Sequence, residues 1–150
     1  MAPGAMNSRF IDNRDDRGNT PAMTNDNKAI IQRALTALLE TRDVGTLAPF
    51  LSDDFIHRRP DSTSATKTEW LAAVRAALVP LADMRVEVLQ LLADGDRVVL
   101  CTRRRLPDGP EVTVVEIWLI RDGLIAEGWE IIEPAARAAA NLTWWEPTSS

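Results

Sequence analysis

The sequence predicts an α+β fold in which N-terminal helices cover one face of a curled, mainly antiparallel sheet. Apolar residues recur at helical spacing up to residue 78, and their period changes to two from Arg85 onward. Asp-Gly pairs at 94–95, 108–109 and 122–123 separate the later apolar runs, and Asp-Gly favours tight hairpin turns. Helices followed by a run of strands are typical of the α+β class.

Two helices are expected before residue 55. Thr24 is a suitable N-cap for a first helix over roughly 25–41, which carries an apolar stripe. Asp43 can cap a short second helix, which we expect to end at 52–54.

A short strand over 55–59 and a turn at 60–62 precede a third helix. Thr66 and Glu69 have the spacing of a capping box, and Pro80 stops the helix that they open. Trp70 lies on the apolar side of this helix.

Four long strands in a meander complete the domain. The alternating runs cover residues 85–92, 97–106, 112–120 and 124–133. The alanine-rich residues 134–140 predict a short helix. We therefore divide the chain into a flexible leader over 1–23, one domain over 24–140 and a tail over 141–150.

Composition restricts the function classes. The chain has 150 residues, a net charge of −5 and one cysteine, Cys101, so a disulfide framework is excluded and a reducing compartment is favoured. The arginines at 103–105 are the only basic cluster, which argues against nucleic acid as a partner. No apolar run reaches the roughly 20 residues of a membrane span. We expect a cytoplasmic protein.

The last hairpin places two acids together if its register is as we expect. A three-residue loop with Gly123 in the left-handed conformation would pair Ile120 with Leu124. One face would then carry Val114, Glu116, Trp118, Ala126, Gly128 and Glu130. The opposite face, with Val115, Ile117 and Leu119, is also apolar and is an alternative interior. Because three helices cannot cover both faces, the second face is expected to meet another subunit.

Acid/base chemistry is the hypothesis that this face suggests. Burial and mutual repulsion would raise the pKa of Glu116 or Glu130 toward neutrality, where a carboxyl can exchange a proton. Alternatively, one acid faces solvent or pairs with Arg104. A three-residue loop between the preceding strands would put Arg104 on the same face as Glu116.

Other residues have competing interpretations. His57, the only histidine, is either a general base or a partly buried strand residue. Trp118, with the small Gly128 on the facing strand, either forms a pocket wall against which a flat ligand packs or is a core residue. A single histidine argues against a metal site.

Two stretches carry a family resemblance, Val115-Glu-Ile-Trp-Leu-Ile-Arg-Asp-Gly-Leu-Ile-Ala-Glu-Gly-Trp-Glu130 and Thr66-Lys-Thr-Glu-Trp-Leu71. With the order of elements over roughly 25–135, they resemble the SnoaL-like polyketide cyclases of the nuclear-transport-factor-two-like superfamily. The resemblance implies a cone-shaped α+β barrel with a central pocket, which dimerises through its outer sheet face. It also implies that Glu130 acts as general base or acid and that Glu116 orients the ligand.

The sequence departs from the family pattern at several positions. Gly128 replaces the usual His, and Glu130 replaces a shorter Asp. The His of some relatives corresponds to Arg58, so His57 is expected on the opposite side of its strand. The chain has no tyrosine for a tyrosine-based oxyanion hole, and Val114 stands in place of the Arg of limonene-type epoxide hydrolases.

The sequence therefore suggests a protein that binds a small apolar or polycyclic ligand and catalyses cofactor-free cyclisation or isomerisation. Glu130 would move the proton, with Glu116 and His57 as the other candidate catalytic residues. The expected ligand contacts are Trp118, Arg104, Gly128, Val114 and Trp70. A noncatalytic binding or dimerisation domain and an epoxide-opening enzyme, with Arg104 between the two acids, are the alternatives.

Overall fold

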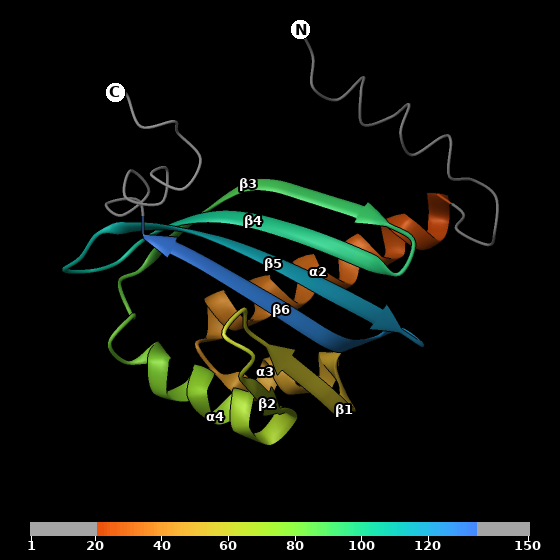
Figure 1. Ribbon diagram of the computed structural model, residues 1–150, viewed down its shortest axis with the longest axis horizontal. Helices are drawn as coiled ribbons and strands as arrows, with labels where there is room; N and C mark the ends of the chain where they lie inside the picture. The colour runs from red at the N-terminus through yellow and green to blue at the C-terminus, as the bar shows by residue number, and fades with distance from the viewer. Residues whose placement is uncertain (1–20, 135–150) are drawn as a thin grey trace, which may run out of the picture.

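The computed structural model describes residues 21–134, which form helices packed on a curved, open sheet of six strands (Figure 1). The helices are α2 (Pro21–Thr41), α3 (Val44–Leu47), the 3-10 helix η1 (Ala48–Phe50) and α4 (Lys67–Leu78). The strands are β1 (Leu51–Arg58), β2 (Ser64–Thr66), β3 (Arg85–Asp94), β4 (Arg97–Arg105), β5 (Glu111–Arg121) and β6 (Leu124–Pro134). The predicted helix over 135–140 lies outside the described residues. The predicted α+β class is confirmed.

The first helix begins earlier than we expected. Helix α2 starts at Pro21, so Thr24 lies inside it and is not its N-cap. Proline is favoured in a first helical turn, where its missing N–H loses no hydrogen bond. The helix ends where Arg42 adopts a positive φ of 55° and its N–H donates to the Leu38 carbonyl at 2.8 Å.

Asp43 caps α3 as predicted, because its carboxylate accepts from the Gly45 N–H at 2.8 Å. The predicted helix end at 52–54 is wrong, since these residues belong to β1. Strand β1 turns back through 60–62 into the short β2. It also pairs in parallel with β6, a long-range contact with no local signal in the sequence.

The capping box of α4 is confirmed. Thr66 accepts from the Glu69 N–H at 3.3 Å, and the Glu69 carboxylate accepts from the Thr66 N–H at 3.0 Å. Because α4 packs against β1 and β2, this cap fixes the angle at which Trp70 approaches the sheet.

The predicted meander is confirmed, since β3 to β6 pair in sequence order. The register of the last hairpin differs from our expectation. Asp122 and Gly123, with φ of 53° and 77°, form a two-residue loop, and Ile120 faces Ile125. A β-bulge then leaves Ala126 unpaired, which shifts the register by one residue. The shorter loop and the bulge together move the pairing by two residues, which keeps each side chain on its expected face, so Glu116 and Glu130 still share one face.

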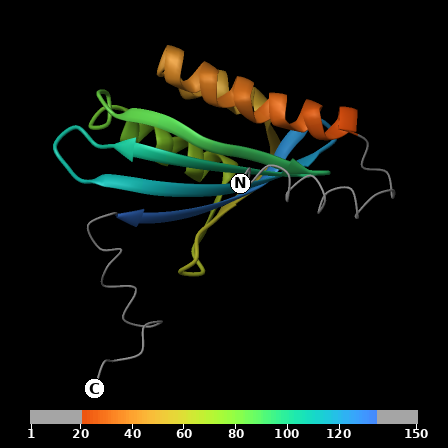
Figure 2. The ribbon, with the colours of Figure 1, turned by 90° about the horizontal axis from the view of Figure 1, so that it is seen from above.

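The helices lie on one side of the sheet (Figure 2). Helix α2 packs on β3 and β4, and the Asn27 amide donates to the Gly95 carbonyl at 2.7 Å. The core lies between these layers. Its fully or nearly buried members include Ile31, Leu47, Leu51, Phe55, Val98, Leu100 and Ile125. No helix in the described part of the chain is long and apolar enough to cross a membrane.

Candidate functional site

A cavity of about 320 Å³ lies between the helices and the concave face of the sheet. Its walls are mainly aliphatic. They include Ile31, Leu35, Leu38, Leu47, Leu51, Val74, Leu78, Leu81, Val86, Leu100 and Ile125. The charged side chains that line it are Arg42, Arg59, Arg104, Glu116 and Glu130. Its volume is at the lower end of the range for small-molecule sites, roughly 300–1,000 Å³.

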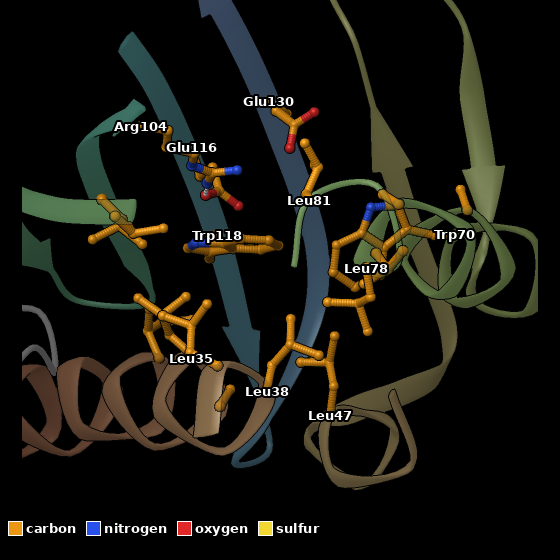
Figure 3. A pocket seen from close by; sticks show the side chains of 18 of the residues that line it. Leu35, Leu38, Leu47, Trp70, Leu78, Leu81, Arg104, Glu116, Trp118 and Glu130 are labelled. Carbon is orange, nitrogen blue, oxygen red and sulfur yellow. Dashed lines mark hydrogen bonds and ion pairs between the residues drawn. The ribbon is translucent and has the colours of Figure 1, made fainter. Parts of the chain in front are cut away.

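Two carboxylates face each other on the sheet side of this cavity. Glu116 of β5 is directly opposite Glu130 of β6, and both side chains point inward (Figure 3). Glu116 is only 6% exposed. Its carboxylate accepts from the Arg104 guanidinium at 2.5 Å, and Arg104 also donates to the Thr102 hydroxyl at 3.1 Å. The register of β4 against β5 puts Arg104 on this face, as predicted.

Burial raises the pKa of Glu116 to about 7, because removing the carboxylate from water penalises its charged form. The Arg104 guanidinium opposes this effect, and the negative charge of Glu130 adds to it. At neutral pH the Glu116 carboxyl can therefore both hold and release a proton.

Glu130 lies closer to solvent than Glu116. Its side chain is 13% exposed, and its carboxylate is 3.7 Å from the guanidinium of Arg59. The Arg59 side chain is 54% exposed, so this ion pair lies where the cavity meets solvent. The two acids thus differ in environment, since Glu116 is held by a half-buried arginine, Arg104, and Glu130 by an exposed one.

An aromatic cluster continues from the acid pair toward α4. Trp118 is opposite Gly128, two residues along each strand from the acids. The Trp70 ring meets the Trp118 ring edge-on, with centroids 6.1 Å apart and planes at 64°. Trp70 also stacks on the His57 ring at 5.1 Å. Both tryptophans line the cavity.

His57 faces the concave side of β1, where it pairs with Gly128, and not the opposite side that we expected. The parallel pairing of β1 with β6 accounts for this difference. Burial, together with the charge of Arg59, lowers the pKa of His57 to about 4, so the ring is neutral at physiological pH. Among the described residues its Nε2 atom has no hydrogen-bond partner.

The cavity brings together five of the eight predicted site residues. These are Glu116, Glu130, Arg104, Trp118 and Trp70. Val114, Gly128 and His57 lie on the same face but behind the lining side chains. Sequence reasoning missed Arg59, because only the pairing of β1 beside β6 brings it near Glu130. It also missed Arg42, whose guanidinium donates to the Leu81 carbonyl at 3.3 Å.

The described residues contain no group of three or more His, Cys, Asp or Glu side chains placed to hold a metal ion. The chemistry that this arrangement can support is proton transfer at the boundary between an apolar cavity and a carboxylate pair.

Solved structures share this fold. A candidate ketosteroid isomerase from Kribbella flavida DSM 17836 is 22% identical, with a TM-score of 0.66 and 85% of each chain covered. IdmH, a candidate polyketide cyclase from Streptomyces antibioticus, is 20% identical, with a TM-score of 0.57 and coverage of 75% of this chain and 97% of its own. An LEH-like epoxide hydrolase from M. tuberculosis is 18% identical, with a TM-score of 0.63 and coverage of 82% and 98%.

At these identities the solved structures establish the fold alone. No functionally curated protein matches the sequence. Residues 31–128, well over half of the chain, match the SnoaL-like domain. This protein therefore belongs to the SnoaL-like family, within the nuclear-transport-factor-two-like fold.

Proposed function

We propose that the protein binds a small, largely apolar carbonyl compound in this cavity and catalyses cofactor-independent isomerisation or cyclisation. The carboxylate of Glu130 removes a proton from the carbon next to the carbonyl. The carbonyl oxygen becomes an enolate oxygen, which Arg104 and the protonated fraction of Glu116 stabilise by charge and hydrogen bonding.

The proton balance is then completed in one of two ways. In an isomerisation, Glu130 returns the proton to a different carbon of the same conjugated system. In a cyclisation, the enolate carbon attacks a second carbonyl of the ligand, and the new alkoxide takes the proton from Glu130. Neither route requires an oxidant, a reductant or a metal.

One observation carries this proposal: two carboxylates occupy opposite positions on adjacent strands and share an apolar cavity, in unequal environments. Unequal environments separate the roles of two acids, because one can be held as a proton donor while the other acts as the base. Glu116, with its pKa raised by burial, fits the first role. Glu130, 3.7 Å from the guanidinium of Arg59 at the edge of the cavity, fits the role of base.

Exchange of the α-protons of 2-tetralone in D2O, followed by proton NMR, tests the proposal. This small bicyclic ketone requires only the proposed first step and its reverse. We expect the wild-type protein to accelerate exchange and Glu130→Gln to lose about 100-fold or more of that rate while keeping its affinity for the ketone. Glu127→Gln is the matched control, because Glu127 lies on the same strand, faces outward and pairs with Arg58. Exchange at the wild-type rate in Glu130→Gln would overturn the proposal.

A noncatalytic binding domain is the alternative from a different class. It predicts that Glu130→Gln changes affinity and that no exchange exceeds the buffer rate. The epoxide-opening alternative requires an arginine that contacts both acids. Arg104 pairs with Glu116, whereas the arginine beside Glu130 is Arg59, so this geometry favours proton transfer at carbon.

We also propose that the protein is a cytoplasmic homodimer that associates through the convex face of the sheet. This face exposes Leu92, Trp129 and Ile131, each more than a third accessible, and no helix of the described region covers it (Figure 1).

A further inference from the structure

Gly128 occupies a strand position where its backbone does not require glycine. Its φ is not positive, unlike those of Gly95 and Gly123 in the turns. Glycine inside a strand weakens the strand because it has no side chain to pack and more backbone freedom to lose. The reason for glycine at 128 must therefore lie in what surrounds it.

The Trp118 ring occupies the space where a side chain at 128 would begin. A Cβ built on Gly128 would lie 2.4 Å from Cζ3 and 2.7 Å from Cε3 of Trp118, distances that real Cβ atoms do not adopt. It would also lie 3.4 Å from Cδ2 of His57. The missing side chain thus lets the Cζ3–Cε3 edge of the indole reach the β6 backbone.

This contact with Gly128 fixes the position of the Trp118 ring relative to the acid pair. Trp118 and Gly128 form the strand pair next to Glu116 and Glu130 on the same face, with one intervening pair that points outward. Trp70 braces the ring edge-on. Figure 3 shows the ring edge-on, with both acids on one side and Leu35, Leu38 and Leu47 on the other. The indole therefore lies between the acid pair and the leucines of α2 and α3.

We propose that the Trp118 indole, whose edge is held against Gly128, is the specificity-determining platform of this cavity and selects ligands with a planar, conjugated ring. Such a ring stacks on the indole face beneath the two acids. The preferred substrates are then aromatic or conjugated carbonyl compounds, in preference to saturated ones of the same size. This inference rests on the proposed ligand-binding function and specifies its substrate class.

Two probes with one carbon skeleton test the platform. They are 2-naphthol, which is planar, and trans-decahydro-2-naphthol, which is saturated, with affinities measured by calorimetry. The readout is the ratio of the two affinities, compared among protein variants so that differences in probe hydration cancel. We expect Trp118→Leu to lower the preference for the planar probe by about three- to tenfold, because stacking adds that much beyond simple burial.

Two further variants separate stacking from damage to the fold. Trp118→Phe keeps an aromatic face and should retain most of the wild-type preference. Trp129→Leu removes a tryptophan from the convex face of the adjacent strand and should leave the preference unchanged. Gly128→Ala, which displaces the indole without removing it, should lower the preference as Trp118→Leu does.

An unchanged ratio in Trp118→Leu, or failure of both probes to bind the wild-type protein, would overturn this inference. The readout is affinity and not turnover. A wild-type exchange rate in Glu130→Gln would therefore refute the catalytic proposal without affecting this inference. An unchanged affinity ratio in Trp118→Leu would refute this inference without affecting the role of Glu130 as the base.

Discussion

Glu116 and Glu130 are paired residues on β5 and β6, yet a half-buried arginine holds the first and an exposed arginine holds the second. Arg104 contacts Glu116 at 2.5 Å from within the sheet, whereas Arg59 lies 3.7 Å from Glu130 at the edge of the cavity. Two like charges in one apolar space destabilise each other. This unequal pairing gives the two acids different roles, because burial raises the pKa of Glu116 whereas Glu130 lies beside a cation at the edge of the cavity.

The first prediction concerns the pH dependence of stability. The pKa of Glu116 is raised by burial from 4.5 to about 7, so the folded state binds a proton that the unfolded state releases between these values. The contribution of Glu116 to the free energy of unfolding should therefore fall as pH rises through this window, by up to ~3 kcal/mol. It opposes the contribution of His57 where the two pH windows overlap. Urea unfolding at a series of pH values measures this slope. The free energy of unfolding of the wild-type protein relative to Glu116→Gln should therefore fall as pH rises from 4.5 to about 7, and a difference that does not depend on pH would contradict the burial argument.

The second prediction concerns His57, whose contribution to the pH dependence of stability has the opposite sign. Its pKa is lowered from 6.5 to about 4, so the unfolded state binds the extra proton between these values. Stability should be lost as pH falls from about 6.5 to about 4. His57→Phe keeps a ring against Trp70 and cannot be protonated, and it also removes the unpartnered Nε2. The variant should lose less free energy of unfolding than the wild-type protein as pH falls through this range in the same urea series. Its stability at pH 7 should not be lower by more than about 1 kcal/mol.

The third prediction concerns the close contact between Gly128 and the Trp118 indole. Gly128→Ala should lower the free energy of unfolding by about 1–3 kcal/mol, because the new Cβ overlaps the Trp118 ring. Gly109→Ala is the matched control. A Cβ at Gly109 would approach no atom closer than 3.5 Å, and its φ is not positive. Chemical denaturation that finds the two variants equally stable would argue against a tight seat for Trp118.

The fourth prediction concerns the convex face. Ile131→Lys places a charge among exposed apolar residues and should weaken self-association by at least about tenfold if this face is the dimer interface. Sedimentation equilibrium measures the dissociation constant. Val79→Lys, in the exposed loop after α4, should leave it unchanged. A monomeric wild-type protein, or a dimer insensitive to Ile131→Lys, would exclude this interface.

Local sequence signals predicted most of the fold. The capping box at Thr66, the Asp43 cap and the meander with its Asp-Gly turns depend on residues within a few positions of each other. The pairing of β1 with β6 joins residues about 70 apart and has no local signature, so the position of Arg59 could not be predicted. The bulge at Ala126 was also not predicted.

The shared face of the two acids was predicted although the register was wrong by two residues, since a shift of two keeps every side chain on the same face. A three-residue loop and a two-residue loop followed by a one-residue bulge preserve the same face alternation, so Glu116 and Glu130 share a face in both registers. Only the structure shows that Glu116 and Glu130 are paired directly across the two strands. The alternative interior, with Val115, Ile117 and Leu119, is the outward set.

The most direct test of the central claim compares Glu130→Asp with Glu130→Gln in the α-proton exchange of 2-tetralone. Aspartate keeps a carboxylate but shortens its reach, whereas glutamine keeps the shape and cannot accept the proton. If Glu130 is the base, Glu130→Asp retains exchange clearly above the rate of Glu130→Gln, which falls to the buffer rate. Equal rates in both variants and the wild-type protein would show that this carboxylate does not move the proton.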